Sequence, residues 1–391
     1  MKINPPLIAL AIGAFGIGVT EFSPMGMLPV IADDLGVSIP RAGMLVSAYA
    51  IGVLIGAPLM TLGFARMGRR SLLLLCLALF TIGNLMSAFA DSYMTLLISR
   101  VVTSFNHGAF FGVGAVVAAS IVPPHKRASA VSAMFTGLTI ATIGGVPLAT
   151  LVGETIGWRP AFFGTAVIGL IAMVSLRFSL PPMKSEVKAD MMAELKVLVR
   201  GNVLSVLLLT VVSSSAMFVV FTYIAPILKE ETGASAGFVT AMLVVYGTGL
   251  AIGNLVSGRL SDISMDGTLI GSLLSVAVLL VLFSFTMDIA WAVVPIIFFW
   301  GMATFALVPP LQVKVVTEAA DAPNLASAMN QGAFNLGNAI GAALGGGVID
   351  AGLGYPAVAL AGAGMALSGL IFALTLRQWA KAKARLAASH A

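Results

Sequence analysis

One carboxylic acid, Glu21, lies deep within an uninterrupted apolar segment of the sequence. Burial at low dielectric favours the neutral acid, whereas a nearby cation favours the carboxylate. An acid held between these two influences can bind and release a proton. Because an ionisable residue at such a depth is costly, it is a hypothesis of function. The alternative is a structural acid that stays hydrogen-bonded at all times.

Two basic residues, Arg100 and His107, lie at a depth that brackets Glu21, if helices rise about 1.5 Å per residue. An ion pair or hydrogen bond from Glu21 to either residue would tune the affinity of the acid for a proton. We therefore predict that Glu21, Arg100 and His107 couple the protein to protons. Arg100 could instead tie helices together, and His107 could hold structure or substrate by hydrogen bonds.

A late apolar segment carries Asn330, Gln331, Asn335 and Asn338, and the last three are spaced for one helical face. Amides both donate and accept hydrogen bonds, which suits hydroxyl-rich or neutral polar ligands. They could also join helices to one another.

Aromatic and sulfur-containing side chains in the first and seventh apolar segments could wall an apolar pocket, although each could also serve packing. With the amides they complete the candidate substrate-binding set: Met25, Asn106, Phe218, Tyr223, Gln331, Asn335 and Asn338.

The composition defines the elements that must position these residues. Of 391 residues, 59% are hydrophobic and 9% are charged, and the mean hydropathy is +1.04. A soluble domain carries about 25% charged residues, so soluble enzymes, disordered linkers and nucleic-acid binders are nearly excluded. Continuous apolar runs also argue against a transmembrane β-barrel, whose strands alternate polar and apolar residues. We predict an all-α polytopic membrane protein.

Twelve apolar runs are long enough to span a membrane as helices. They cover residues 6–31, 41–64, 71–90, 94–121, 128–153, 160–180, 202–228, 235–259, 268–287, 290–316, 323–348 and 356–377. With the N-terminus inside, seventeen Lys and Arg residues fall in inner segments and three in outer segments. This bias predicts that both termini are cytoplasmic.

The two halves of the chain repeat each other at an offset of 197 residues. YAIGVLIG (49–56) aligns with YGTGLAIG (246–253), and Asp91 aligns with Asp288. Such repeats are an architecture of secondary transporters, with the binding site between the halves. We predict a six-helix bundle at 1–180, a cytoplasmic linker at 181–201, and a second six-helix bundle with a short tail at 202–391. The linker could be an amphipathic surface helix or a solvated segment.

Two loops then become diagnostic, TLGFARMGRRSLLL (61–74) and GRLSDISMDGTLI (258–270). They resemble the G-x-x-x-D-R-x-G-R-[RK] loops of the major facilitator superfamily, although the first copy lacks the acid and the second lacks the basic end. The resemblance implies that these loops tether helix ends on the inner face. The alternative is that the basic residues of the first loop only anchor it on the cytoplasmic side of the membrane, where Lys and Arg are enriched. The candidate gating residues are Arg66, Gly68, Arg69, Arg70, Gly258 and Asp262.

The fifth predicted helix, GLTIATIGGVPLATLVGETIGWR (137–159), resembles the glycine-proline motif of drug:proton antiporters. Glycines allow close helix packing and proline bends a helix, so Gly144, Gly145 and Pro147 join the gating candidates. The segments 13–36, 106–112, 222–228 and 326–355 resemble the arabinose-efflux-permease branch of AraJ/YdhP-like inner-membrane exporters, and this resemblance covers nearly the whole chain.

The resemblance implies a proton-coupled antiporter in the bacterial inner membrane that exports sugars, nucleosides or lipophilic drugs. It also implies a monomer whose partners are its substrate and membrane lipids. The alternatives are a proton symporter, an uncoupled facilitator, or a receptor without transport. We expect no enzyme activity, metal or cofactor, because the H-E-x-x-H, G-x-S-x-G and G-x-x-x-x-G-K-[ST] motifs are absent from the sequence. Protons would be the coupling ion.

Overall fold

The computed structural model describes residues 4–64, 66–123, 127–183, 196–197, 199–321 and 323–389. All regular elements in these ranges are helical, as predicted. The N-terminal group comprises α1 (Pro5–Gly26), α2 (Leu28–Asp34), α3 (Ile39–Gly63), α4 (Arg69–Ala88), α5 (Tyr93–Ser104), α6 (His107–Ser120), α7 (Arg127–Ile140), the π-helical turn η2 (Ala141–Gly145), α8 (Val146–Ile156) and α9 (Trp158–Ser179). The C-terminal group comprises α11 (Gly201–Phe221), α12 (Ile224–Glu230), α13 (Ala236–Thr286), α14 (Ala290–Phe305), α15 (Val308–Glu318), α16 (Pro323–Asp350) and α17 (Gly354–Ser389).

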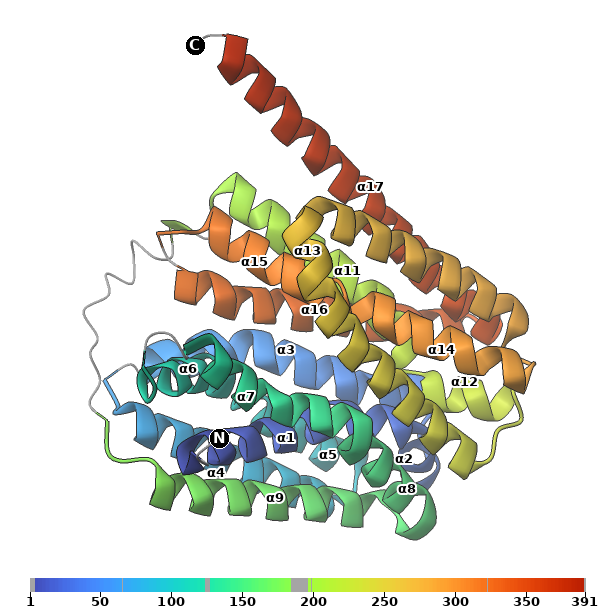
Figure 1. Cartoon of the computed structure of the whole chain (residues 1–391). Helices are drawn as coiled ribbons and strands as arrows, with labels where there is room; N and C mark the ends of the chain where they lie inside the picture. Colours follow the sequence, from blue (N-terminus) through green and yellow to red (C-terminus); the bar gives the residue numbers. More distant parts are fainter. Residues whose placement is uncertain are drawn as a thin grey trace.

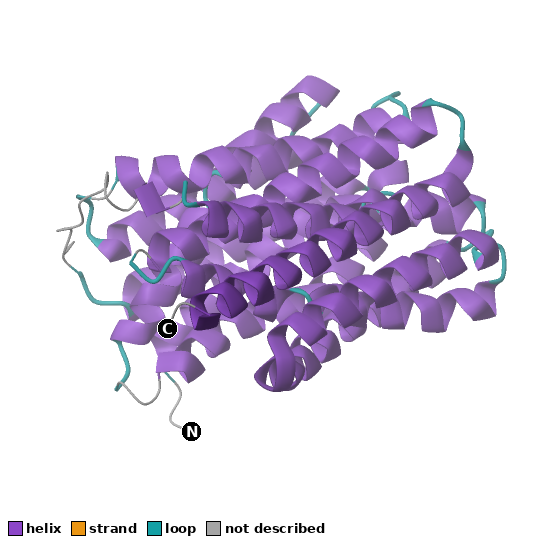
Figure 2. Ribbon diagram, turned by 90° about the horizontal axis from the view of Figure 1, so that it is seen from above, coloured by secondary structure: helices purple, strands orange, loops and turns teal. Residues whose placement is uncertain are grey.

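Most of these helices run along a common direction (Figure 2). Eleven segments of the described residues are long and apolar enough to cross a membrane. The twelfth passage is α16, whose several Asn and Gln residues lower its hydropathy. Several passages are broken: α1 passes into α2, α5 into α6, α11 into α12 and α14 into α15.

One expected boundary differs in the structure. The predicted spans 235–259 and 268–287 correspond to Ala236–Ser261 and Ile263–Thr286, which are two spans within α13 separated where Ser264 leaves helical geometry. The Ser264 hydroxyl accepts a hydrogen bond from the backbone N–H of Gly267 at 3.0 Å, as an N-cap does for a new helix. The last helix, α17, does not stop near residue 377 but continues to Ser389 and protrudes beyond the bundle (Figure 1).

The two groups lie against each other, with the N-terminal group in the lower part of Figure 1 and the C-terminal group in the upper part. Across their interface α3 packs on α16, while α13 packs on η2 and α8. The predicted linker at 181–201 stays a prediction, because residues 184–195 and 198 lie outside the described ranges.

The bundle has two ends, on the left and right of Figure 1. We call the left end, with residues 66–68, 121–123 and 319–321, the terminal end. The right end, with residues 35–38 and 231–235, is the distal end.

Candidate functional site

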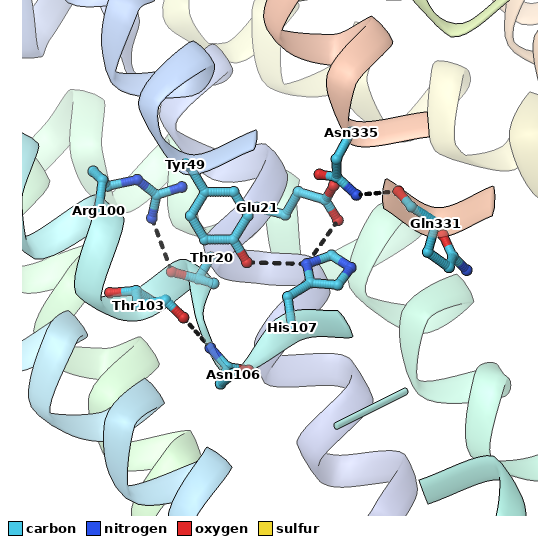
Figure 3. Close-up of polar contacts among 9 residues, drawn as sticks. All are labelled: Thr20, Glu21, Tyr49, Arg100, Thr103, Asn106, His107, Gln331 and Asn335. Carbon is cyan, nitrogen blue, oxygen red and sulfur yellow. Dashed lines mark hydrogen bonds and ion pairs between the residues drawn. The ribbon is translucent and has the colours of Figure 1, made fainter. Parts of the chain in front are cut away.

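Glu21 and His107 lie together within the N-terminal group (Figure 3). Glu21 is on α1 and is 7% exposed. His107 is the first residue of α6, directly after the break between α5 and α6. The Glu21 Oε2 atom is 3.9 Å from His107 Nδ1. The break thus presents the imidazole to the only acid buried in α1, and the predicted pair of residues is adjacent in the structure.

Tyr49 of α3 completes this contact, although the sequence singled it out only as a mark of the internal repeat. Its hydroxyl lies 3.1 Å from His107 Nδ1. The guanidinium of Arg100 lies over the Tyr49 ring, 4.3 Å from its centroid. A cation over an aromatic face is stabilised by the quadrupole of the ring. Tyr49 therefore connects the two basic residues that were predicted separately.

Arg100 of α5 is fully enclosed, at 1% exposure. Its Nη1 donates to the Thr20 hydroxyl at 3.2 Å, and that hydroxyl donates to Asn84 Oδ1 at 2.6 Å. Among the described residues, Arg100 makes no ion pair with Glu21 within 4.0 Å. The predicted direct contact of Glu21 is thus made with His107, while Arg100 is joined to the network through Tyr49 and Thr20.

The amides of α16 divide into two kinds. Asn330 accepts from Thr210 at 2.8 Å and donates to Gln312 at 2.8 Å, so it joins helices within the C-terminal group. Asn335 donates to the carbonyl of Gln331 at 3.0 Å.

The Oδ1 atoms of Asn335 and Asn338 have no hydrogen-bond partner among the described residues, although both side chains are 1% exposed. Buried polar atoms of this kind are rare and costly. Figure 3 shows Asn335 and half-buried Gln331 on the C-terminal side of the Glu21 network. The substrate-binding role of these amides stays a prediction.

The remaining candidates for substrate contact are buried. Met25 and Phe218 belong to the apolar core between the groups. The Tyr223 hydroxyl donates to the carbonyl of Ala342 at 2.7 Å, so in this conformation the protein itself satisfies it. Asn106 donates to the carbonyl of Thr103, and its own Oδ1 is unpartnered among the described residues.

An ion pair that the sequence did not single out joins the two groups at the distal end. Lys229 of α12 contacts both carboxylate oxygens of Glu154 of α8, at 2.6 and 2.7 Å. The Glu154 side chain is 7% exposed and that of Lys229 is 27% exposed. It is the one ion pair between the groups among the described residues, because the others lie within a group. The distal end is closed in this conformation.

The candidate gating residues of the loops make local contacts at the terminal end. Arg70 donates to the carbonyl of Arg177 at the end of α9, and Gly68 approaches the backbone of Met183. Among the described residues Arg66 and Arg69 form no ion pair. Gly258 faces open space, and the Asp262 side chain lies outside the described part.

The glycine-proline motif coincides with an irregular stretch of helix. Gly144 and Gly145 close the π-helical turn η2, and Pro147 lies in the first turn of α8. Gly145 packs against Phe15 and Val19 of α1, while Gly144 faces open space. Such π-helical turns are frequent at functional sites. The role of these residues in gating stays a prediction.

Twelve helical passages in two packed groups, with one acid and two basic residues buried inside the first group, are features of a membrane transport protein. Comparisons with known proteins give the family. Residues 10–329 match the Major Facilitator Superfamily. The inner membrane transport protein YdhP of Escherichia coli (strain K12) is 58% identical over 363 residues, which are 93% of each chain. The putative transporter AraJ of the same strain is 35% identical, with 90% of each chain covered.

Solved structures agree on the fold. A D-xylose-proton symporter superposes with a TM-score of 0.73 at 17% identity, covering 94% of this chain and 97% of its own. A bacterial homologue of the lysosomal transporter Spinster gives a TM-score of 0.70 at 15% identity, covering 96% of both chains. The chain therefore belongs to the major facilitator superfamily, and its predicted resemblance to the AraJ/YdhP-like branch is confirmed.

Proposed function

We propose that this protein is a proton-coupled antiporter that exports small organic molecules across the bacterial inner membrane by alternating access. The observation that carries the proposal is the contact of Glu21 with His107 inside a membrane-spanning group of helices. Sugars, nucleosides and lipophilic drugs are the substrate classes to test. Protons are the coupling ion, no cofactor takes part, and the monomer is the working unit.

The geometry around His107 supports a proton switch. Nδ1 lies within reach of both the Tyr49 hydroxyl and the Glu21 carboxyl, but it holds either a hydrogen or a free lone pair. When Glu21 is ionised, an Nδ1–H is attracted to the carboxylate. When Glu21 is protonated this attraction is lost, and the tautomer with its hydrogen on Nε2 becomes favourable, because its free Nδ1 lone pair accepts a hydrogen bond from Tyr49. Loading one proton thus rearranges contacts among α1, α3 and α6.

The arrangement of charge supports an orientation. The excess of Lys and Arg on the inner segments favours a cytoplasmic terminal end. In that orientation the Lys229–Glu154 pair closes the periplasmic side. Export then requires the pair to separate, so that the interface opens to the periplasm and admits a proton to Glu21.

The experiment compares the protein with its Glu21→Gln variant in proteoliposomes. A panel of arabinose, uridine, chloramphenicol and tetraphenylphosphonium is first screened for compounds that raise the unfolding midpoint, because a ligand of the folded state stabilises it. Each stabilising compound is then assayed in radiolabelled form, with and without an imposed proton gradient. We expect Glu21→Gln to lose gradient-driven accumulation and to retain exchange at equal pH.

Asp91→Asn is the control, since Asp91 is an exposed acid at the distal end. It should accumulate the compound as the parent protein does. Undiminished accumulation by Glu21→Gln would refute the assignment of Glu21. Transport by the parent protein that ignores the gradient would instead identify a facilitator.

A further inference from the structure

A line of hydrogen bonds next to Glu21 joins α4, α1 and α5. Asn84 of α4 donates from Nδ2 to the carbonyl of Phe80 at 2.8 Å, which leaves its Oδ1 as the acceptor. The Thr20 hydroxyl of α1 donates to that Oδ1 at 2.6 Å. Arg100 of α5 donates from Nη1 to the Thr20 oxygen at 3.2 Å (Figure 3). The side chains of Thr20, Asn84 and Arg100 are 0%, 0% and 1% exposed, so bulk water does not compete for these contacts.

The direction of the Thr20 hydroxyl decides what its oxygen can do for Arg100. A hydroxyl has one hydrogen to donate and two lone pairs that accept. While Asn84 Oδ1 holds that hydrogen, the lone pairs are left for the guanidinium. Without Asn84 the hydroxyl is free to turn its hydrogen towards Arg100, and the acceptor is lost. Asn84 therefore keeps Thr20 in the role of acceptor.

Thr20 is the one hydrogen-bond acceptor of Arg100 among the described residues. The Nε and Nη2 atoms of Arg100 are buried without a partner, and no carboxylate in the described part of the chain lies within 4.0 Å of it. The rings of Tyr49 and Phe162 lie 4.3 and 5.8 Å from its Cζ atom. A buried cation without a counter-ion is costly, so a guanidinium released from Thr20 would seek a carboxylate.

The internal repeat offers a comparison within the chain. At the offset of 197 the counterparts of this line, and of the acid beside it, are all apolar: Met217 for Thr20, Phe218 for Glu21, Val281 for Asn84 and Ile297 for Arg100. Helix packing alone therefore does not need these polar groups at equivalent positions. The line occurs in the half that holds the acid, as expected if it serves that acid.

We propose that Asn84 and Thr20 are positioning residues, which hold Arg100 away from Glu21 and so set the pH at which Glu21 takes up a proton. The proposal rests on the function proposed above, in which Glu21 is the proton-binding acid. Glu21 directly follows Thr20 in α1, so it is the acid next to a guanidinium that leaves Thr20. A cation beside a carboxylate favours its ionised form, and Glu21 would then stay ionised to a lower pH.

The other groups that face Glu21 do not depend on this line. His107 of α6 lies 3.9 Å from the carboxylate, and Tyr49 of α3 lies 3.1 Å from His107. No other Lys, Arg or His of the described residues lies within 4.0 Å of Glu21. A change that follows loss of Asn84 or Thr20 therefore reports on Arg100.

The test is an infrared pH titration of the whole protein in lipid nanodiscs. The C=O stretch of the protonated Glu21 carboxyl is assigned as the band that Glu21→Gln lacks, and its height is followed against pH. Thr20→Val keeps the shape of the side chain without the hydroxyl, and Asn84→Leu removes the amide. We expect both variants to lower the midpoint by about one to three pH units, which is the effect of a cation beside a carboxylate. Thr20→Ser keeps the hydroxyl and should restore the midpoint of the parent.

Ser87→Ala is the matched control for buried hydrogen bonds between α4 and α5. The Ser87 hydroxyl lies one turn after Asn84 and 2.7 Å from that of Ser99, and a serine, Ser284, stands at its repeat position. Its removal should leave the midpoint unchanged, and unfolding midpoints verify that every variant folds. In an Arg100→Gln background, Thr20→Val should cause no further shift, because it acts through Arg100.

Three results would overturn the proposal. The first is an unshifted midpoint in both Thr20→Val and Asn84→Leu, and the second is a shift by Thr20→Val that persists in the Arg100→Gln background. The third is the absence of any titrating band that Glu21→Gln removes. The titration uses neither a solute nor a gradient, so failure of proton-driven transport is a separate result.

Discussion

The Glu154→Gln substitution tests whether the distal ion pair holds the transporter closed. Lys229 Nζ lies 2.6 and 2.7 Å from the two carboxylate oxygens, and Glu154 is nearly enclosed. A hydrogen bond to a charged group contributes about 1.5–3 kcal/mol net. Because Gln keeps the shape and one weaker hydrogen bond, we expect about 1–2 kcal/mol to be lost from the closed state. The equilibrium should then shift about 5- to 30-fold towards distal opening.

The shift can be measured as a distance across the distal end. Spin labels at Asp91→Cys and Asp288→Cys would lie in opposite groups, at exposed positions that correspond in the repeat. Cys76 is buried, so it should not compete for the label. Double electron–electron resonance should show a longer-distance population that grows in Glu154→Gln. The Lys229→Gln variant should give a similar change, and the double variant little more than either single variant.

Asp34→Asn provides the matched control. It breaks the Arg159–Asp34 ion pair, which also lies at the distal end at 2.7 Å but within the N-terminal group. An exposed pair inside one rigid group should not affect how the groups separate. If Glu154→Gln and Asp34→Asn give the same distance distribution, the Lys229–Glu154 ion pair does not hold the distal end closed.

Two further substitutions test neighbouring contacts. Tyr49→Phe removes the hydroxyl that lies 3.1 Å from His107 but keeps the ring beneath Arg100. Because one hydrogen bond contributes about 1 kcal/mol, we expect proton-driven accumulation in proteoliposomes to fall about fivefold. Unchanged accumulation would remove Tyr49 from the proton switch. Gly247→Val places a side chain against the backbone of Thr142, so α13 should no longer close on η2, and the same spin-label distance should lengthen. A distance identical to that of the parent would show that this contact does not limit closure.

The sequence predicts the fold well because long apolar runs leave few structural solutions. In a bilayer core every backbone polar group must be paired, so such runs become helices. The ends of helices are harder to predict. The polar residues between the eighth and ninth spans suggest a loop, whereas in the structure only Ser264 leaves helical geometry and caps the helix that follows. The amides of α16 were read as part of a span, and the structure confirms one helix over Pro323–Asp350.

The site could be predicted only where one residue was unusual in its own segment. Glu21 stands out because an acid in an apolar run is rare, and His107 was then found from its depth. Tyr49 gave no such signal, since a tyrosine in a membrane helix is ordinary. Its importance comes from α3 bringing it between Arg100 and His107, which is a tertiary contact. The 197-residue repeat marked its position without giving a reason.

The Lys229–Glu154 pair was missed for a related reason. Each residue lies at the end of an apolar run, where charges are expected to face water. Only the packing of α8 against the C-terminal group shields Glu154 and makes the pair a contact between groups. Arg159 and Asp34 also form an ion pair at the distal end, but it is exposed and lies within one group. Sequence position alone therefore does not distinguish an ion pair that joins the two groups from one at the surface of a single group.

The strength of the Lys229–Glu154 ion pair also bears on the proposed coupling of transport to protons. Moving one charge through 100 mV of membrane potential is worth about 2.3 kcal/mol, which is of the same order as the 1–2 kcal/mol expected to be lost from the closed state in Glu154→Gln. In the proton-coupled cycle proposed above, a proton that enters towards Glu21 would supply free energy for separating Lys229 from Glu154. An ion pair much stronger than the free energy of proton entry would keep the distal end closed. A much weaker ion pair would let the distal end open without a proton, so that solute would cross without coupling. We therefore expect neutralising this ion pair to raise gradient-independent exchange, whereas neutralising Glu21 abolishes gradient-driven accumulation.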